Sequence, residues 1–189
     1  MVPHRSPITE RIDWLFGLAQ RHAQEYASPE AWLARQRHLA NHPTAILVMK
    51  CMDGRINIPI ATGTPRGIIQ PFRNLGGMFH LGWPHLGEII QSAVDKEVRQ
   101  GRQVLMMITY HFSRGDHRRG CAGFHYRTAD ARAHTFDIQR EVSTLFGAGH
   151  GSVYPLVCGF ETDEDALVVH GQDGQTLNMA DLGAQDIDS

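Results

Sequence analysis

The sequence predicts an α/β fold with a mostly parallel central sheet flanked by helices. Apolar runs of strand length, including residues 45–50 and 104–110, alternate with segments such as 84–100 whose apolar residues repeat at helical spacing. The run 104–110 is apolar on both faces, which is typical of a central parallel strand. Because strands that alternate with helices indicate a parallel sheet, these observations favour the α/β class.

Two helices are predicted before the first strand. The first spans about 7–26 and is indicated by an apolar stripe with three- and four-residue spacing, namely Ile8, Ile12, Leu15, Phe16 and Leu18. The second begins at Pro29, because Ser28 is a suitable N-cap and proline is favoured at the first helical position, and it runs to about residue 39. We expect residues 1–40 to form an N-terminal helical arm and residues 41–189 to form a single α/β domain.

The α/β domain is predicted to contain strands and helices in the order expected of its class. The segment 56–64 has an ambiguous pattern, 63–67 is a turn, and the polar tail after Gly171 is expected to be partly frayed. The predicted elements are strands at 45–50, 67–72, 104–110, 153–160 and 166–170, with helices at 84–100, which Gly101 ends, and at 128–146.

Composition describes an ordinary globular protein and excludes several classes of partner. The chain has 189 residues, 42% of them hydrophobic, and a formal net charge of -2. This charge gives no reason to expect binding to nucleic acid or to a membrane surface. No apolar run is long enough to span a bilayer, and residues 1–6 lack the apolar core of a signal peptide, so we expect a cytoplasmic protein.

Chemistry-bearing side chains follow two of the predicted strands. Cys51, Asp53 and Arg55 come directly after the strand 45–50, and His111 and Cys121 follow the strand 104–110. Sites in open α/β sheets form at the carboxyl ends of strands, so these side chains are expected to meet. Two thiolates and an imidazole suit a zinc ion with an open fourth position, and a guanidinium can clamp a carboxylate through two hydrogen bonds. The sequence therefore predicts a zinc site in the 41–189 domain and favours an enzyme over a passive fold. The alternative is that Cys51 and Cys121 are buried structural thiols and that His111 is a histidine with its hydrogen bonds satisfied within the fold.

Other chemistries fit the sequence less well. The three cysteines are too few for a disulfide framework, and Cys158 lies in an apolar run and is interpreted as a core residue. Asn57 stands where a Cys-x5-Arg phosphatase loop would need arginine, and the chain has neither a P-loop nor a serine hydrolase elbow. The glycine pair at 76–77 is interpreted as a turn, and the arginines of the 113–120 loop as a solvated loop or as an attractor of anions.

The order of these motifs resembles the β-class carbonic anhydrases. Cys51, Asp53 and Arg55 match that family's Cys-x-Asp-x-Arg motif, and the segment 73–76 is similar to its Arg-Asn-Ala-Gly motif. The resemblance covers about residues 40–172. It implies zinc held by Cys51, His111 and Cys121, with water or Asp53 at the fourth position, and reversible hydration of carbon dioxide to bicarbonate. Asp53 and Arg55 would be the catalytic pair, with Arg55 holding Asp53 off the metal, and the N-terminal helices would form a homodimer or a multiple of one.

The spacing of the last two ligands departs from the family pattern. The family has His-x-x-Cys-Gly, whereas the basic loop 113–120 separates His111 from Cys121 here. Either His111 remains the ligand or His117 replaces it, and His111 is favoured because it ends a strand. Two other functions remain open at this point: hydrolysis of another heterocumulene, such as carbonyl sulfide or carbon disulfide, and a zinc-binding pseudoenzyme that serves as a binding or sensing module.

Overall fold

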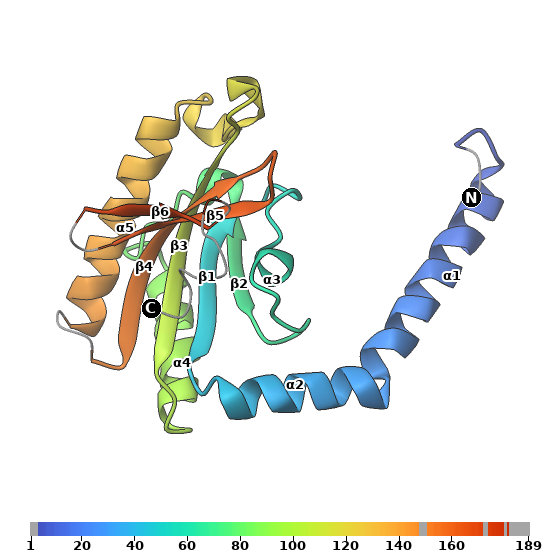
Figure 1. Ribbon diagram of the computed structural model, residues 1–189, viewed down its shortest axis with the longest axis horizontal. Coiled ribbons are helices and arrows are strands. Elements are labelled where there is room, and N and C mark those ends of the chain that lie inside the picture. The colour runs from blue at the N-terminus through green and yellow to red at the C-terminus, as the bar shows by residue number, and fades with distance from the viewer. Residues whose placement is uncertain (1–3, 148–150, 172–173, 180, 182–189) are drawn as a thin grey trace.

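A six-stranded mixed sheet forms the centre of the protein (Figure 1). The computed structural model describes residues 4–147, 151–171, 174–179 and 181. Four strands are parallel and two at one edge are antiparallel, which confirms the predicted mostly parallel α/β sheet. In sheet order the strands are β2 (Gln70–Asn74), β1 (Ala45–Cys51), β3 (Val104–Phe112), β4 (Val153–Glu161), β5 (Ala166–His170) and β6 (Thr176–Asn178).

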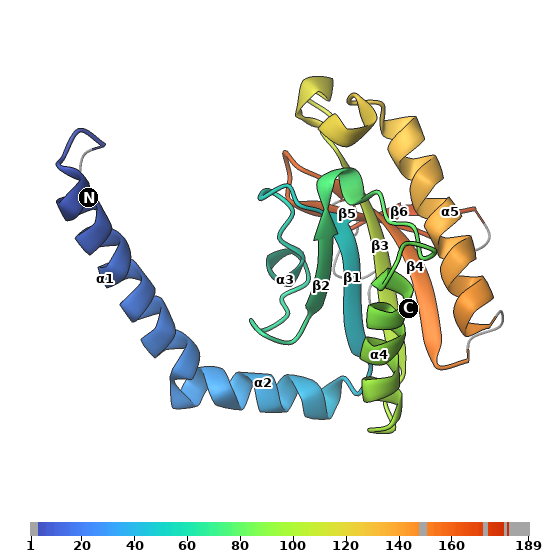
Figure 2. The same ribbon diagram turned by 180° about the vertical axis from the view of Figure 1, so that it is seen from behind.

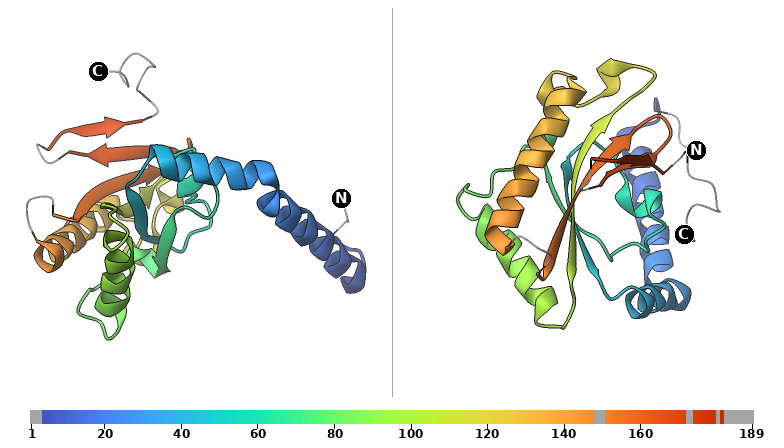
Figure 3. Two further views of the ribbon diagram at one scale, coloured as in Figure 1. Left: turned by 90° about the horizontal axis from the view of Figure 1, so that it is seen from below. Right: turned by 60° about the vertical axis from the view of Figure 1, so that its left-hand side comes forward.

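Helices α4 (Leu86–Val98) and α5 (Thr128–Phe146) cover one face of the parallel strands, as Figures 2 and 3 show. Their apolar sides pack on a cluster that includes Leu47 of β1 and Met106 of β3. Burial of this apolar surface is the main force that holds the layers together. The other face carries a second cluster, which includes Val48 and the residues around the short helix α3 (Ile58–Ala61). Both strand faces are covered, as the run of apolar residues in β3 predicted.

The two N-terminal helices project from the sheet as an arm (Figure 1). They are α1 (Ile8–Ala27) and α2 (Pro29–Asn41), and the Ser28 side chain caps α2 by accepting from the amide of Ala31 at 3.2 Å. Neither helix buries a residue, and Phe16 is 68% exposed. The apolar stripe of α1 is therefore not covered by its own domain. Among the described residues, no helix is long and apolar enough to cross a membrane.

Several boundaries differ from the sequence prediction because pairing decides them. Strand β2 spans 70–74 instead of 67–72, since its residues pair with residues 47–51 of β1. Strand β3 continues to Phe112, so His111 lies within the strand. The tail expected to fray contains β6, which pairs with β5, while residues 172–173, 180 and 182–189 lie outside the described part. The ambiguous segment 56–64 contains α3.

Candidate metal centre

Three potential ligands meet at the carboxyl ends of β1 and β3. Cys51 is the last residue of β1, His111 is the penultimate residue of the neighbouring strand β3, and Cys121 immediately precedes the short helix η3 (Ala122–Phe124). One ligand atom from each lies within 4.8 Å of the others, and all three side chains are buried. His117 is exposed and outside this cluster. The histidine of the cluster is therefore His111 and not His117. The 113–120 loop leaves the sheet after His111 and brings the chain back to the cluster at Cys121.

The cluster fits a zinc ion. Both ring nitrogens of His111 are buried and have no hydrogen-bond partner in the described part of the chain. Buried polar atoms almost always have a partner, so this histidine lacks one that a cation would provide. Two sulfur ligands and one imidazole nitrogen are a donor set that zinc favours, and three protein ligands are typical of its catalytic sites.

The two cluster thiols have opposite tendencies to ionise. A hydrogen bond from the Cys121 side chain lowers the pKa of Cys51, with further support from the His111 side chain and from the backbone of Asp53 and Gly76. The pKa of Cys121 is raised by the same hydrogen bond, by burial and by the charge of Cys51. Without a cation, two adjacent buried thiolates would repel each other. A bound metal ion would let both ionise, so metal binding at this site should release protons.

Asp53 lies beside the cluster and is held by Arg55. The Arg55 side chain donates to both carboxylate oxygens, with 3.1 Å from Nε to Oδ1 and 2.6 Å from Nη2 to Oδ2, and its backbone amide donates to Oδ1 at 2.9 Å. These hydrogen bonds lower the pKa of Asp53 to about 2. Oδ2 lies 4.0 Å from Nδ1 of His111. An ionised, oriented carboxylate thus stands at the edge of the cluster.

The buried glycines at 76 and 77 position the cluster, which the sequence analysis missed by treating them as a turn alone. Both have positive φ angles, of 76° and 67°, which glycine adopts without strain. A Cβ on Gly77 would lie 3.2 Å from the backbone nitrogen of Cys51, and a Cβ on Gly123 would lie 2.7 Å from Cα of Gly76. The carbonyl of Gly76 lies 3.7 Å from Sγ of Cys121. Small residues at these positions therefore let the two cysteine segments approach each other.

The 113–120 loop is exposed to solvent over residues 114–119, as one of its two interpretations had it, and two of its arginines pair with carboxylates. Arg119 pairs with Asp163 at 2.6 Å, and Arg114 lies 3.7 Å from a carboxylate oxygen of Glu164. Both acidic residues belong to the turn between β4 and β5. The sequence signal was the acidic run 162–165, which the sequence analysis did not connect with the loop.

Comparisons with known proteins agree with this fold and site. The catalytic-domain family of the carboxysome shell carbonic anhydrase matches residues 44–182. The solved structure of the β-carbonic anhydrase CcaA is 11% identical to the chain, with a TM-score of 0.57, and the similarity covers 96% of this chain and 97% of CcaA. Comparison with curated protein sequences finds no match.

Two further solved structures are similar at lower TM-scores. A carbonic anhydrase from Streptococcus mutans is 16% identical, with a TM-score of 0.43, over 72% of this chain and 92% of its own. A carbon disulfide hydrolase is 15% identical, with a TM-score of 0.40, over 84% of this chain and 89% of its own.

The fold shared with CcaA is that of the β-carbonic anhydrases. Since the family match covers most of the sequence, this chain belongs to the family of the carboxysome shell carbonic anhydrase catalytic domain, as a divergent member of the β-carbonic anhydrase family.

Proposed function

We propose that the protein binds zinc through Cys51, His111 and Cys121 and catalyses the reversible hydration of carbon dioxide to bicarbonate and a proton. The observation that carries this proposal is the buried cluster itself, with ligand atoms within 4.8 Å of one another and a histidine whose buried ring nitrogens have no hydrogen-bond partner among the described residues. Membership of a carbonic anhydrase family supports the choice of reaction.

The chain supplies the orientation that this chemistry needs. Zinc, when bound, would lower the pKa of a water molecule toward ~7, which makes a nucleophile available near neutral pH. Asp53 is ionised there and its Oδ2 faces the cluster, so it would accept a hydrogen bond from the reacting water and fix its direction. Arg55 occupies both oxygens of Asp53 and so restrains this carboxylate from becoming a fourth ligand that would close the site.

The proposal is tested by zinc analysis and stopped-flow hydration assays on full-length protein. Cys51→Ser and His111→Ala should each lose most of the bound zinc and the activity, because each removes one of three ligands. The matched controls are Cys158→Ala, which changes a buried cysteine outside the cluster, and His117→Ala, which changes the exposed histidine. Full zinc occupancy in both ligand variants would refute the assignment.

The same assays separate the two other functions. The ligand set would also serve hydrolysis of carbonyl sulfide or carbon disulfide, so each substrate is tested with the wild-type protein. Turnover of one of these, but not of carbon dioxide, would replace the proposed substrate. Zinc binding without turnover of any of the three would indicate a pseudoenzyme that binds or senses a ligand.

We infer that the protein is a homodimer or a higher homo-oligomer whose arms are covered by a second copy. The support is the exposed apolar surface of the arm, where Leu15, Phe16 and Trp32 are 59%, 68% and 56% exposed. Exposed apolar patches of this kind mark interaction sites, and two-fold pairing is the commonest oligomer symmetry.

A further inference from the structure

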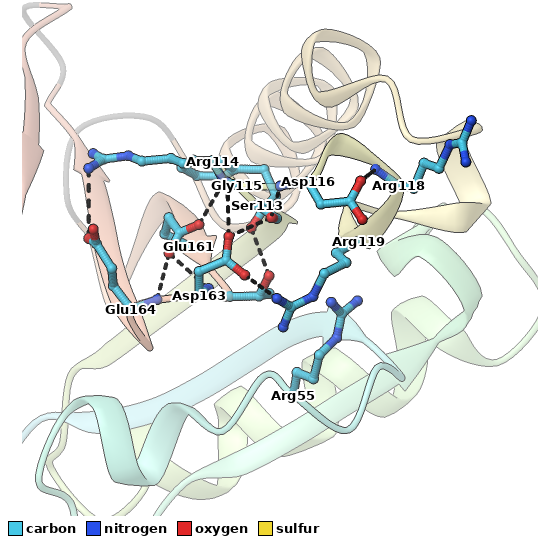
Figure 4. Close-up of polar contacts among 12 residues, drawn as sticks. Arg55, Ser113, Arg114, Gly115, Asp116, Arg118, Arg119, Glu161, Asp163 and Glu164 are labelled. Carbon is cyan, nitrogen blue, oxygen red and sulfur yellow. Dashed lines mark hydrogen bonds and ion pairs between the residues drawn. The ribbon is translucent and has the colours of Figure 1, made fainter.

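The loop that separates the last two proposed ligands is fastened to the turn between β4 and β5. It leaves the end of β3 at Ser113 and reaches Cys121 after the short helix η2 (His117–Arg119). The turn, residues 162–165, lies against it, since the amide of Thr162 donates to the carbonyl of Phe112 at 2.9 Å. Figure 4 shows the loop and the turn facing each other through their polar groups.

Asp163 contacts the loop at three points. Its Oδ2 accepts from the hydroxyl of Ser113 at 2.5 Å and from the amide of Gly115 at 3.0 Å, and its Oδ1 pairs with Nη1 of Arg119 at 2.6 Å. These points lie at the beginning and the end of the loop. One carboxylate therefore joins the segment that follows His111 to the segment that precedes Cys121.

Buried Glu161 fixes the position of Asp163. Its side chain is fully buried, and Oε2 accepts from the amides of Asp163 at 2.9 Å and of Glu164 at 2.7 Å. Oε1 accepts from the amide of Arg114 at 2.8 Å. A carboxylate with three amide donors is well satisfied in a buried place, so the turn presents Asp163 in a defined orientation.

Asp163 also influences Arg55, which pairs with Asp53 at the edge of the metal cluster. The side chain of Arg55 lies beside that of Arg119 in Figure 4, and the negative charge of Asp163 favours the charged form of Arg55. Arg55 in turn holds Asp53 through both carboxylate oxygens. The negative charge of Asp163 thus balances two guanidinium groups that would otherwise repel each other.

We propose that Asp163 is a positioning residue of the zinc site, which sets the place of Cys121 through Arg119 and supports the Arg55–Asp53 pair. This inference rests on the proposed function, because it takes Cys121 as a zinc ligand. Arg119 is two residues before Cys121, so fastening its side chain limits where the thiolate can lie. If the 113–120 loop is ordered before zinc binds, binding costs no further conformational entropy in the loop, and the affinity for zinc is higher for this reason.

The test compares zinc affinity of full-length variants by competition with a chelator. Asp163→Ala removes all three contacts and should weaken zinc binding by about 10–100-fold, the effect typical of residues that orient ligands. Asp163→Asn keeps one acceptor oxygen but loses the charge that Arg119 needs, so a smaller loss is expected. Arg119→Gln should resemble Asp163→Asn.

Each variant has a matched control. Glu164→Gln changes a neighbouring carboxylate on the same turn, whose side chain lies 3.7 Å from Arg114 and does not contact Arg119. Arg118→Gln changes the adjacent arginine, whose side chain has no partner in the described part of the chain. Both controls should bind zinc as the wild-type protein does.

A second measurement separates positioning from a general contribution to stability. The absorption spectrum of the cobalt-substituted protein reports the ligands and the geometry around the ion. It should change in Asp163→Ala and stay unchanged in the controls. Lower thermal stability of the metal-free variant with wild-type zinc affinity and an unchanged cobalt spectrum would overturn the inference.

The outcomes also distinguish this inference from the proposed function. A wild-type protein that binds no zinc would overturn both. Zinc binding by the wild-type protein, with equal affinity in Asp163→Asn and Arg119→Gln, would overturn the positioning role alone. If Asp163→Ala fails to fold, the zinc affinities of Asp163→Asn and Arg119→Gln decide whether Asp163 has a positioning role.

Discussion

At the scale of single residues, the geometry of the Asp53–Arg55 pair matters more than its charge. The Arg55 side chain is about one-third exposed, and ion pairs this close to solvent contribute little to stability. The planar guanidinium nevertheless contacts both oxygens of Asp53 and so fixes the direction of the carboxylate. We therefore expect the pair to contribute to catalysis more than to folding.

Replacing Arg55 by lysine tests this expectation. Arg55→Lys keeps the positive charge but loses the two-pronged contact, so Asp53 is free to rotate. We expect kcat/KM for hydration of carbon dioxide to fall by about 10–100-fold, with bound zinc and thermal stability nearly unchanged. Stopped-flow assays and zinc analysis measure these quantities, and Arg118→Lys is the control. Wild-type kcat/KM in Arg55→Lys would show that charge alone suffices.

At the scale of elements, His170 joins the antiparallel edge of the sheet to its centre. Its Nε2 lies 2.9 Å from the hydroxyl of Tyr110 on β3, and its Nδ1 lies 3.1 Å from the hydroxyl of Thr176 on β6. Arg132 of α5 also approaches its Nδ1, at 3.5 Å. Burial, and then the positive charge of Arg132, lower the pKa of His170. The structure therefore favours the neutral imidazole.

Stability should consequently fall as the solution becomes acidic. Below pH ~6.5 the unfolded chain binds a proton at this histidine while the folded protein does not, so the free energy of unfolding decreases with decreasing pH. The contribution of neutral His170 to the free energy of unfolding is complete above pH ~6.5. It is lost as the pH falls below that value toward the lowered pKa of this histidine in the folded state.

Thermal unfolding of His170→Gln between pH 8 and pH 5 measures this contribution. The variant should show a weaker pH dependence than the wild-type protein. Part of the dependence should remain, because burial also lowers the pKa of His38 and His134. His117→Gln, at an exposed position, should keep the wild-type slope. Equal slopes in His170→Gln and the wild-type protein would contradict the prediction.

At the scale of the whole molecule, the arm carries a large share of the exposed apolar side chains, including Ile8, Leu15, Phe16 and Trp32. Its side chains meet the domain near the corner of the two helices, where Arg66 lies 2.8 Å from Nδ1 of His22. Most of α1 extends away from the sheet (Figure 1). An apolar face of this kind costs free energy in water, so a second copy that covers it would stabilise both chains.

Light scattering on the full-length protein and on a truncated protein that begins at Asn41 tests this pairing. The full-length protein should be a dimer or a multiple of one, and the truncated protein should be smaller in subunit number. Phe16→Glu should weaken association, because a charge is costly in an apolar interface, whereas Gln24→Glu on the same exposed helix should not. A monomeric full-length protein would show the inference to be wrong.

The truncated protein also tests the proposed division of the chain into an arm, 1–40, and a zinc domain, 41–189. If the division is right, the truncated protein should retain bound zinc.

The sequence by itself determined the class of fold and the set of side chains at the site. Apolar periodicity reports which face of a segment is buried, and it located the helix 128–146 and the beginning of each long strand. Because parallel strands end at one edge of the sheet, the positions of Cys51 and His111 after two apolar runs were enough to predict their meeting. The role of the cluster in binding zinc remains a proposal.

The tertiary structure alone decided how the distant segments meet. The 113–120 loop that leads to Cys121 contacts Asp163, which lies far along the chain, and no local pattern encodes such contacts. The close packing of Gly77 against Cys51 likewise joins segments that are distant in the sequence. Periodicity and capping act over a few residues, whereas these features arise when separate segments pack against one another, so only the folded chain reveals them.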